Sequence, residues 1–426
     1  MTLAPVTRID VQPWMQDPHT LSVLAPLQGE GRAARFVGGC VRDAVIGRPV
    51  HDIDIATEWR PQEVISRLAA AGVHVVPTGI AHGTVTAVVA RRPYEITTLR
   101  VDVESHGRHA TVAFSDDWSG DARRRDFTMN AMYLDSDGSL YDPTDGLPDL
   151  HRGLVRFVGD ARRRIDEDVL RLLRFFRFHS HYGRGAPDGQ AVEACRAMVD
   201  RLPALSGERV RAELLRLLLA GDPLPALTLM ADIGVFRHLP LAAEVTPATG
   251  RLFAIERAHD GPDALRRLAA IMRPQPAAVR DVASRLRLAN AERERLVALT
   301  SPGGEVRQPP TDAADGRRLV FALGDHAADR IMLGWARYGE VGAPAWIDLW
   351  RLARRWKRPD LPVGGADVIA RGIPSGPQVG ALLAALERWW ADSDFAPERD
   401  AVLVRLDALI GGGATGEAGS DPDTPQ

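Results

Sequence analysis

The stretch "FVGGCVRDAVIGRPVHDIDIAT", residues 36–57, joins a pair of glycines to two aspartates through a short connecting segment. Apolar residues on both sides of that segment predict strands at 33–39 and 52–56. Alternate residues of a strand point to the same face, so Asp52 and Asp54 are expected side by side. Two carboxylates in this arrangement suit Mg²⁺, which completes its coordination shell with water and phosphate oxygens. The stretch therefore predicts a metal and phosphate site on a strand.

The glycine pair supports a phosphate site in the same place. Gly38 and Gly39 would allow a triphosphate to approach the backbone at the start of the next helix. Arg42 could contact a phosphate oxygen, and Asp43 could instead fix Arg42 or the backbone. Taken alone, Asp-x-Asp is more often a solvated strand face, and Gly-Gly could be only a turn. Their occurrence together in a strand–turn–helix–strand pattern favours the functional interpretation.

The remaining pattern divides the chain into two kinds of structure. Further strands are predicted at 73–77, 83–90 and 94–100, a helix at 61–72, and a hairpin at 131–143 around Asp137-Gly138. From about residue 161 the apolar residues recur at i, i+3 and i+4, which predicts helices. The fold class expected is α+β, with a small mixed or antiparallel sheet in the head and an all-α body and tail. Residues 301–312 are predicted to be a linker or long loop.

Length and composition restrict the function classes. A chain of 426 residues is too long for one ordinary core, so several domains are expected. The net charge of −3 means that any nucleic-acid site must be a local basic region. No apolar run is long enough for a membrane span, and the N-terminus lacks a secretory signal pattern. Cys40 and Cys195 cannot form a disulfide framework, which predicts a reducing, cytoplasmic location.

A second polar cluster lies in "DARRRDFTMNAMYL", residues 121–134. Arg124, Arg125 and Asp126 precede an apolar turn that contains Asn130. An arginine pair beside an aspartate could hold the phosphates and ribose of a nucleotide through charge-assisted hydrogen bonds. The alternative is an Arg–Asp surface pair at a helix start, which contributes little free energy.

A third cluster, "EDVLRLLRFFRF" at 167–178, places Asp168, Arg171, Arg174 and Arg177 at successive steps of three on a predicted helix. Asp168 and Arg171 could face a base while the other two arginines reach phosphates. Cytosine and adenine both present an amino donor beside a ring-nitrogen acceptor, which suits an Asp-plus-Arg edge. Guanine and uracil present an N–H where the arginine needs an acceptor. The alternative is an amphipathic helix with a charged outer face.

In this order, "GGCVRD" with "DIDIAT", "RRDFTMNAM", "EDVLRLLRFFRF" and "SGERVRAELLRLL" (206–218) resemble the class II tRNA nucleotidyltransferase/poly(A) polymerase family. That family belongs to the DNA polymerase β-like nucleotidyltransferase superfamily. The resemblance is strong over about residues 30–220 and weaker to about 410. The combination of motifs is specific, whereas no single motif is.

The resemblance implies catalytic, Mg²⁺-binding roles for Asp52 and Asp54, and Glu95 could be a third carboxylate. It also implies nucleotide-binding roles for Gly39, Arg42, Arg125, Asp168, Arg171, Arg174 and Arg177. The residue pattern adds Gly38, Asp43, Arg124, Asp126 and Asn130 to the predicted nucleotide-binding set. Some family members carry a metal-dependent phosphohydrolase domain. Here His259 and Asp260 lack partner histidines at ligand spacing, so His259 is expected at the surface and a phosphatase is disfavoured.

The activity that the resemblance implies is template-independent addition of CCA to tRNA 3′ ends from CTP and ATP, with release of pyrophosphate. The alternatives are a poly(A) polymerase, a partial CC- or A-adding enzyme, and a non-catalytic RNA-binding protein. The loop at 101–114 could move between C and A addition. The expected domains are a nucleotidyltransferase head at 1–160, a nucleotide-selecting neck at 161–220, a helical body at 221–300, a tRNA-binding tail at 301–410 and a disordered end at 411–426. No membrane association is expected, and no protein partner is readable.

Overall fold

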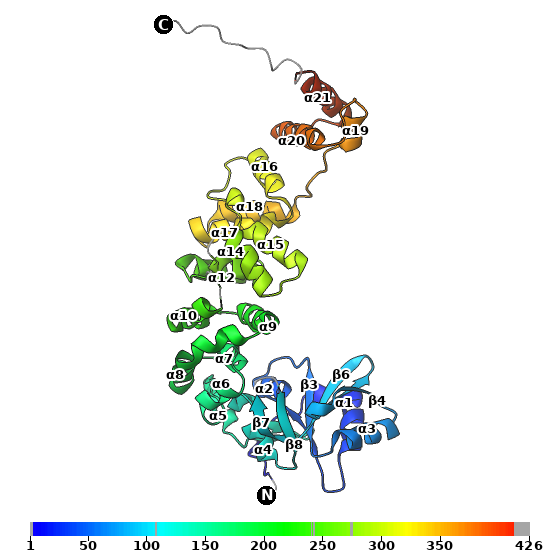
Figure 1. Cartoon of the computed structure of the whole chain (residues 1–426), viewed down its shortest axis with the longest axis vertical. Helices are drawn as coiled ribbons and strands as arrows, with labels where there is room; N and C mark the ends of the chain where they lie inside the picture. The colour runs from blue at the N-terminus through cyan, green and yellow to red at the C-terminus, as the bar shows by residue number, and fades with distance from the viewer. Residues whose placement is uncertain (1–2, 107–108, 240, 242, 273–275, 413–426) are drawn as a thin grey trace.

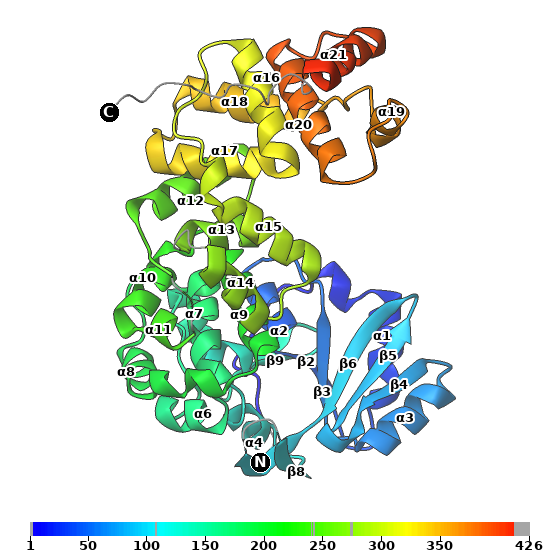
Figure 2. The ribbon, with the colours of Figure 1, turned by 45° about the horizontal axis from the view of Figure 1, so that its top comes forward.

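The chain runs from a head that contains the main sheet to a series of helices that ends far from it (Figure 1). This computed structural model describes residues 3–106, 109–239, 241, 243–272 and 276–412. Figures 1 and 2 place helices α7 (Leu170–Tyr182) and α9 (Gly207–Leu218) between the sheet and the helices of the second half. Within the described residues, no helix combines the length and apolarity that crossing a bilayer requires.

The head contains one eight-stranded mixed sheet in the order β1-β10-β9-β2-β3-β6-β5-β4. Its strands are β1 (Thr7–Arg8), β2 (Ala34–Val37), β3 (Ile53–Thr57), β4 (His74–Gly79), β5 (Thr84–Val89), β6 (Arg92–Thr98), β9 (Tyr133–Leu134) and β10 (Ser139–Tyr141). Strand β3 pairs with β6 in parallel and with β2 in antiparallel orientation. The expected α+β class with a mixed-sheet head and helical remainder is therefore confirmed.

The helices of the head connect or flank these strands, and a series of helices follows the head. In the head they are α1 (Pro18–Leu24), α2 (Gly39–Val45), α3 (Pro61–Ala70), α4 (Trp118–Arg123) and α5 (Gly146–Arg152). Beyond it, besides α7 and α9, they are α6 (Ala161–Glu167), α8 (Gly189–Met198), α10 (Leu224–Ile233), α11 (Val235–His238), α12 (Pro247–His259), α13 (Ala264–Ile271), α14 (Pro276–Arg285), α15 (Asn290–Thr300), α16 (Ala313–Leu323), α17 (Ala327–Tyr338), α18 (Pro344–Arg355), α19 (Gly365–Ile369), α20 (Pro377–Asp392) and α21 (Arg399–Gly412).

The described parts of the predicted loop at 101–114 differ from the prediction, and residues 107–108 lie outside the described residues. These parts form a two-stranded antiparallel hairpin of β7 (Arg100–His106) and β8 (His109–Phe114), separate from the main sheet. Valine and threonine recur along this stretch, and such β-branched residues favour extended backbone. The hairpin predicted around Asp137-Gly138 is present, and Gly138 has a φ of +88° there.

The single helix predicted through 167–178 is wrong at its start. Helix α6 ends at Glu167, Asp168 is extended with φ −154° and ψ 106°, and α7 begins at Leu170. The Asp168 carboxylate accepts a hydrogen bond from the Leu170 backbone N–H at 3.1 Å. A short acidic side chain that bonds to backbone amides starts a new helix more readily than it continues an old one. Asp168 therefore precedes the helix that carries the three arginines.

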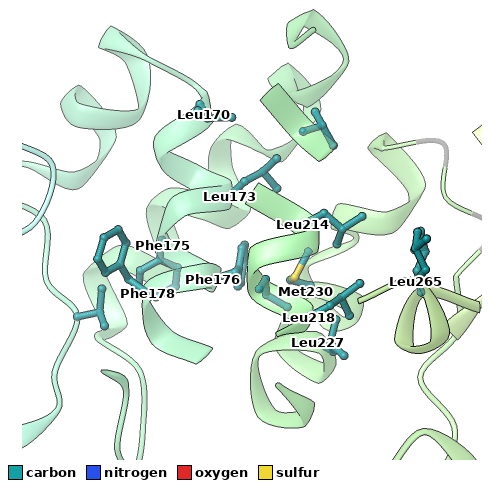
Figure 3. Close-up of a cluster of buried hydrophobic side chains, with 14 of the residues drawn as sticks. Leu170, Leu173, Phe175, Phe176, Phe178, Leu214, Leu218, Leu227, Met230 and Leu265 are labelled. Carbon is teal, nitrogen blue, oxygen red and sulfur yellow. The ribbon is translucent and has the colours of Figure 1, made fainter. Parts of the chain in front are cut away.

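Apolar packing fixes α7 against α9. Figure 3 shows Leu173 and Phe176 of α7 facing Leu214 and Leu218 of α9, with Met230 of α10 beside them. All five side chains are almost fully buried, and each contributes about 1.5–3 kcal/mol by leaving water. This packing fixes the position of α7 relative to α9, and so the positions of the polar side chains that the two helices carry.

The apolar cores indicate how the long helical part is divided. One cluster runs from the head into α18, while a separate cluster in the last helices includes Val368, Leu386, Trp390, Val402 and Leu406. The domain boundaries expected at 160, 220 and 300 stay predictions.

The two irregular segments expected from composition have different outcomes. Residues 301–312 connect α15 to α16 through one short 3₁₀ turn, as expected for a long loop. The disordered end was predicted from residue 411, but Gly411 and Gly412 belong to α21. Residues 413–426 lie outside the described residues.

Candidate active site

A cavity of about 610 Å³ opens between the head and helices α7 and α9. We call it the central cavity. Its lining residues are Gly38, Gly39, Arg42, Asp54, Arg124, Arg125, Asp126, Asn130, Asp168, Leu170, Arg171, Arg174, Arg177, Phe178, Arg209 and Arg216. All of the site residues predicted from the sequence are among them except Asp43, Asp52 and the possible third carboxylate Glu95. Three clusters that are separate in sequence thus share one cleft.

The glycine pair lies against the carboxylate of Asp54. Gly38 has a φ of +76°, which an L side chain rarely adopts, and precedes the first residue of α2. A Cβ atom at Gly38 would lie 3.7 Å from Oδ2 of Asp54 and 3.8 Å from Nη1 of Arg125. Glycine at this position therefore keeps the backbone open to the cavity between a carboxylate and a guanidinium.

Asp52 occupies a different position from the one predicted. It lies in a bend just before β3, is exposed and does not line the central cavity, and the strand begins one residue later than expected. Asp54 is on β3, between the fully buried Ile53 and Ile55, and is opposite Glu95 of β6 in the parallel register. Asp54 thus lies opposite Glu95 on the neighbouring strand, and the charge of Asp52 also acts on it.

The pKa of Asp54 depends on its burial and on the charged groups around it. Burial, followed by the nearby carboxylates of Glu95 and Asp52, raises the pKa of Asp54 to about 6, against the opposing charge of Arg125. The neighbouring thiol of Cys40 is buried, and burial and the Asp54 charge raise its pKa to about 12. Cys40 is therefore a protonated packing residue at neutral pH.

The carboxylates fit a divalent cation that phosphate and water also coordinate. In the part of the chain that the structure describes, no group of three or more His, Cys, Asp and Glu side chains is arranged to hold a metal by itself. Mg²⁺ needs only one or two protein carboxylates when phosphate oxygens and water complete its shell. A bound cation would offset the repulsion that raises the pKa of Asp54. His259, expected at the surface, is half-buried against Trp335 and Trp350.

Arg42 is held in one orientation by its neighbours. Its Nε and Nη2 each donate to the Asp43 carboxylate at 3.0 Å, and its Nη1 donates to Oδ1 of Asn130 at 2.8 Å. The Tyr182 ring lies 4.1 Å from the guanidinium carbon. Asp43 thus orients Arg42 rather than lining the cavity itself.

The arginine pair at 124–125 has a partner that sequence reasoning missed. Arg124 and Arg125 both donate to Asp121 of α4, at 2.6–3.1 Å, and the Tyr133 hydroxyl donates to the same carboxylate at 2.8 Å. Asp121 is only 1% exposed, so this is no surface pair. Burial alone would raise the pKa of Asp121, but the two guanidinium groups hold it well below its ordinary value. The signal was present in the sequence, because Asp121 precedes these arginines by three and four residues.

Asp126 joins the second cluster to α7. Its carboxylate accepts from Nε and Nη2 of Arg174 at 2.8 and 2.5 Å and from Nδ2 of Asn130 at 3.1 Å. Glu213 of α9 lies 3.6 Å from Arg174 and accepts from Nε of Arg177 at 2.5 Å. The arginines of α7 are therefore held from both sides of the cavity.

Asp168 and Arg171 line the cavity, and their side chains bind different partners. Nη2 of Arg209 donates to Asp168 at 2.7 Å, and Nη1 of Arg171 donates to Glu167 at 2.6 Å. Arg171 also donates to the backbone carbonyl of Arg124 at 3.2 Å. An acceptor and a donor are thus fixed separately at this end of the cavity.

Helix α9 contributes residues that sequence reasoning gave no individual role. Arg209, Glu213 and Arg216 follow at i, i+4 and i+7, which places them on one face of the helix. Among the described residues, Arg216 makes no ion pair with a carboxylate. The cavity lining contains eight arginines and three aspartates. This excess of positive charge suits a polyanionic ligand.

Family models match two parts of the chain. The model described as "Poly A polymerase head domain" matches residues 34–156, which include the glycine pair, Asp54 and the arginine pair at 124–125. The model described as "Probable RNA and SrmB- binding site of polymerase A" matches residues 187–245.

Individual relatives match most of the chain. The "CCA tRNA nucleotidyltransferase 1, mitochondrial" of Danio rerio is 35% identical over 390 residues, which are 87% of this chain and 86% of the relative. The "CCA-adding enzyme" of Latilactobacillus sakei is 30% identical over 379 residues, 87% of this chain and 92% of the relative. The crystal structure of the Bacillus stearothermophilus CCA-adding enzyme in complex with CTP superimposes with a TM-score of 0.75 and 28% identity, over 95% of this chain and 99% of that structure. The chain therefore belongs to the CCA tRNA nucleotidyltransferase (CCA-adding enzyme) family.

Proposed function

We propose that this protein adds CCA to the 3′ ends of tRNA from CTP and ATP, without a nucleic-acid template, and releases pyrophosphate. One observation carries the proposal. A single cavity is lined by Asp54, by the arginine pair at 124–125, and by Asp168 with the arginines of α7. Relatives over most of the chain carry names with this activity, and similar solved structures have titles that include CTP, ATP or tRNA.

Different residues of the site would bind the metal and the phosphates and ribose of the nucleotide. Asp52 and Asp54 would hold Mg²⁺, which when bound neutralises phosphate charge and favours attack by the RNA 3′-hydroxyl. Arg42, Arg124 and Arg125, held by Asp43 and Asp121, would bind phosphates and ribose through preorganised donors. Preorganisation matters because the donors then need no reorientation as charge develops.

Base selection is proposed for the other end of the cavity. The Asp168 carboxylate would accept from the amino group of cytosine or adenine, and Arg171 would donate to the neighbouring ring nitrogen. Guanine and uracil would leave a buried N–H facing a donor, which costs about 1–3 kcal/mol per unsatisfied group. Arg174 and Arg177 would contact the phosphates.

The direct test supplies CTP and ATP together, with CTP alone and ATP alone as controls, to a tRNA transcript that lacks CCA. The proposal expects stepwise addition of C, C and A, followed by arrest. A long A tail would instead identify a poly(A) polymerase, and incorporation that stops after CC, or that adds only A, would identify a partial activity. Binding of tRNA without any incorporation would identify an RNA-binding protein.

The raised pKa of Asp54 predicts a pH dependence for the metal-free protein. A carboxyl whose pKa is higher folded than unfolded contributes stability below about pH 4. That contribution is lost as the pH rises through the folded value of about 6. Mg²⁺ is therefore expected to raise the unfolding temperature at pH 7.5 more than at pH 5, since it requires the deprotonated form.

Thermal unfolding with and without Mg²⁺ measures this effect, and Asp54→Asn is the control because it does not titrate. An equal Mg²⁺ effect at both pH values in the wild type would contradict the assignment of Asp54 as a ligand.

The tail and the cellular location belong to the same proposal. The last helices would hold tRNA by its shape and backbone rather than by its sequence. The cytoplasmic location expected from the free cysteines stays a prediction, and three relatives carry names that end in "mitochondrial".

A further inference from the structure

A network of buried charges lies in the body, away from the central cavity. Arg266 and Arg267 of α13 and Glu256 of α12 are between 0% and 2% exposed. Glu256 accepts from Nε of Arg266 at 2.7 Å through one oxygen and from Nε of Arg267 through the other. Replacing buried ion pairs with apolar residues is often neutral or stabilising, so stability alone does not explain such a network.

Arg267 also forms hydrogen bonds to the backbone at the end of α9. Its Nη1 donates to the backbone carbonyls of Leu218 and Ala220 at 2.5 and 2.6 Å. Leu218 is the last residue of α9, and the final carbonyls of a helix have no partner within the helix. A cation at this end also interacts favourably with the helix dipole. Arg267 of α13 thus binds the backbone carbonyls at the C-terminal end of α9.

The helix that Arg267 anchors carries part of the nucleotide site. Glu213 lies five residues before Leu218 and holds Arg174 and Arg177 of α7. Arg209, near the other end of α9, holds Asp168. Side chains on a helix keep their spacing, so a shift at the C-terminal end moves Glu213 relative to α7.

We propose that Arg267 is a positioning residue for nucleotide binding, which acts through the C-terminal end of α9 on Glu213 and the arginines of α7. This inference rests on the proposed function only for the identity of the nucleotides. Arg267 itself contacts no residue of the cavity lining in the contacts described above. Its effect on the ligand is therefore indirect.

The test compares Arg267→Met with Arg295→Met. Arg295 belongs to the same network through Asp263 and Asp329, and its contacts there involve neither α9 nor the cavity. Both variants lose one guanidinium from the body, so both are expected to unfold at a lower temperature. Only Arg267→Met is expected to weaken CTP and ATP binding, by about 3- to 30-fold in Kd, the range of coupling through packed elements.

Equilibrium titration of the full-length protein with CTP and with ATP, without RNA, measures this Kd. A partly unfolded preparation lowers the number of binding sites without changing Kd, which separates positioning from simple loss of fold. Arg267→Lys keeps the charge with fewer donors and is expected to give an intermediate Kd. If Arg267→Met does not fold, Glu256→Gln releases Arg267 with little change of shape and is expected to raise Kd as well.

An unchanged Kd in folded Arg267→Met, or an equal rise in Arg295→Met, would overturn the inference. A wild-type protein that binds CTP and ATP but extends no tRNA would overturn the proposed function and leave the Kd comparison valid. A wild-type protein that binds neither nucleotide would overturn both.

Discussion

Asp54→Asn is expected to lower kcat for nucleotide addition by about a thousandfold, because a metal ligand contributes several kcal/mol to transition-state charge stabilisation. The substitution keeps the shape of the side chain and removes the charge that faces Gly38 and Arg125. It also removes the repulsion from Glu95 and Asp52 that raises the pKa of Asp54. The variant should therefore fold at least as well as the wild type while losing activity.

The measurement is single-turnover incorporation of CTP into a tRNA transcript, with tRNA binding measured in parallel. Binding of tRNA should be retained, because the substitution lies in the head at the nucleotide cavity. Asp52→Asn tests the second ligand, and Glu95→Gln is the matched comparison at the facing position of β6. Near-normal incorporation by Asp54→Asn would rule out the metal assignment, and an equally large loss in Glu95→Gln would add a third carboxylate to it.

Asp121→Ala is expected to lower the free energy of unfolding by about 3–5 kcal/mol, because it leaves two arginines without their shared buried carboxylate. Tyr133 loses its acceptor at the same time. The low pKa of Asp121 means that its stabilising charge is present at neutral pH and is lost only in strong acid. Denaturant unfolding at pH 7 therefore measures the full effect.

The control is Glu193→Ala, which removes an exposed ion pair with Arg162 at 3.6 Å. Exposed pairs of this kind contribute about 0–1 kcal/mol. Asp121→Asn keeps the shape and should lose less stability than alanine, but should still raise KM for CTP and ATP, because Arg124 and Arg125 lose their charged anchor. A loss in Asp121→Ala no greater than in Glu193→Ala would show that Asp121 does not hold the arginine pair.

Short-range patterns predicted the elements that carry the site. The strands near Phe36 and Ile55 and the change to helices near residue 161 follow from local periodicity, which nearest neighbours in sequence determine. Two of the predicted element boundaries were wrong. Asp168 lies between α6 and α7 and accepts a hydrogen bond from the Leu170 backbone N–H, and strand β3 begins after Asp52.

The order of motifs, as a resemblance, indicated the family and the group of residues that gather in one cavity. The partners that orient those residues came only from the tertiary structure. Arg174 meets Asp126 across 48 positions of sequence, Asp168 meets Arg209 across 41, and Arg177 meets Glu213 across 36. Such pairs depend on how α7 and α9 pack, and no local pattern encodes a distance between elements.

The sequence by itself determined the fold class, the family and the chemistry available to the site, because strand alternation, helical periodicity and residue type are local properties. Only the tertiary structure decided which carboxylate orients which arginine, and that Arg267 in the body holds the end of α9. The physical reason is that ion pairs and helix caps between distant segments form where packing brings their atoms within bonding distance. That packing results from the whole buried surface rather than from any one stretch.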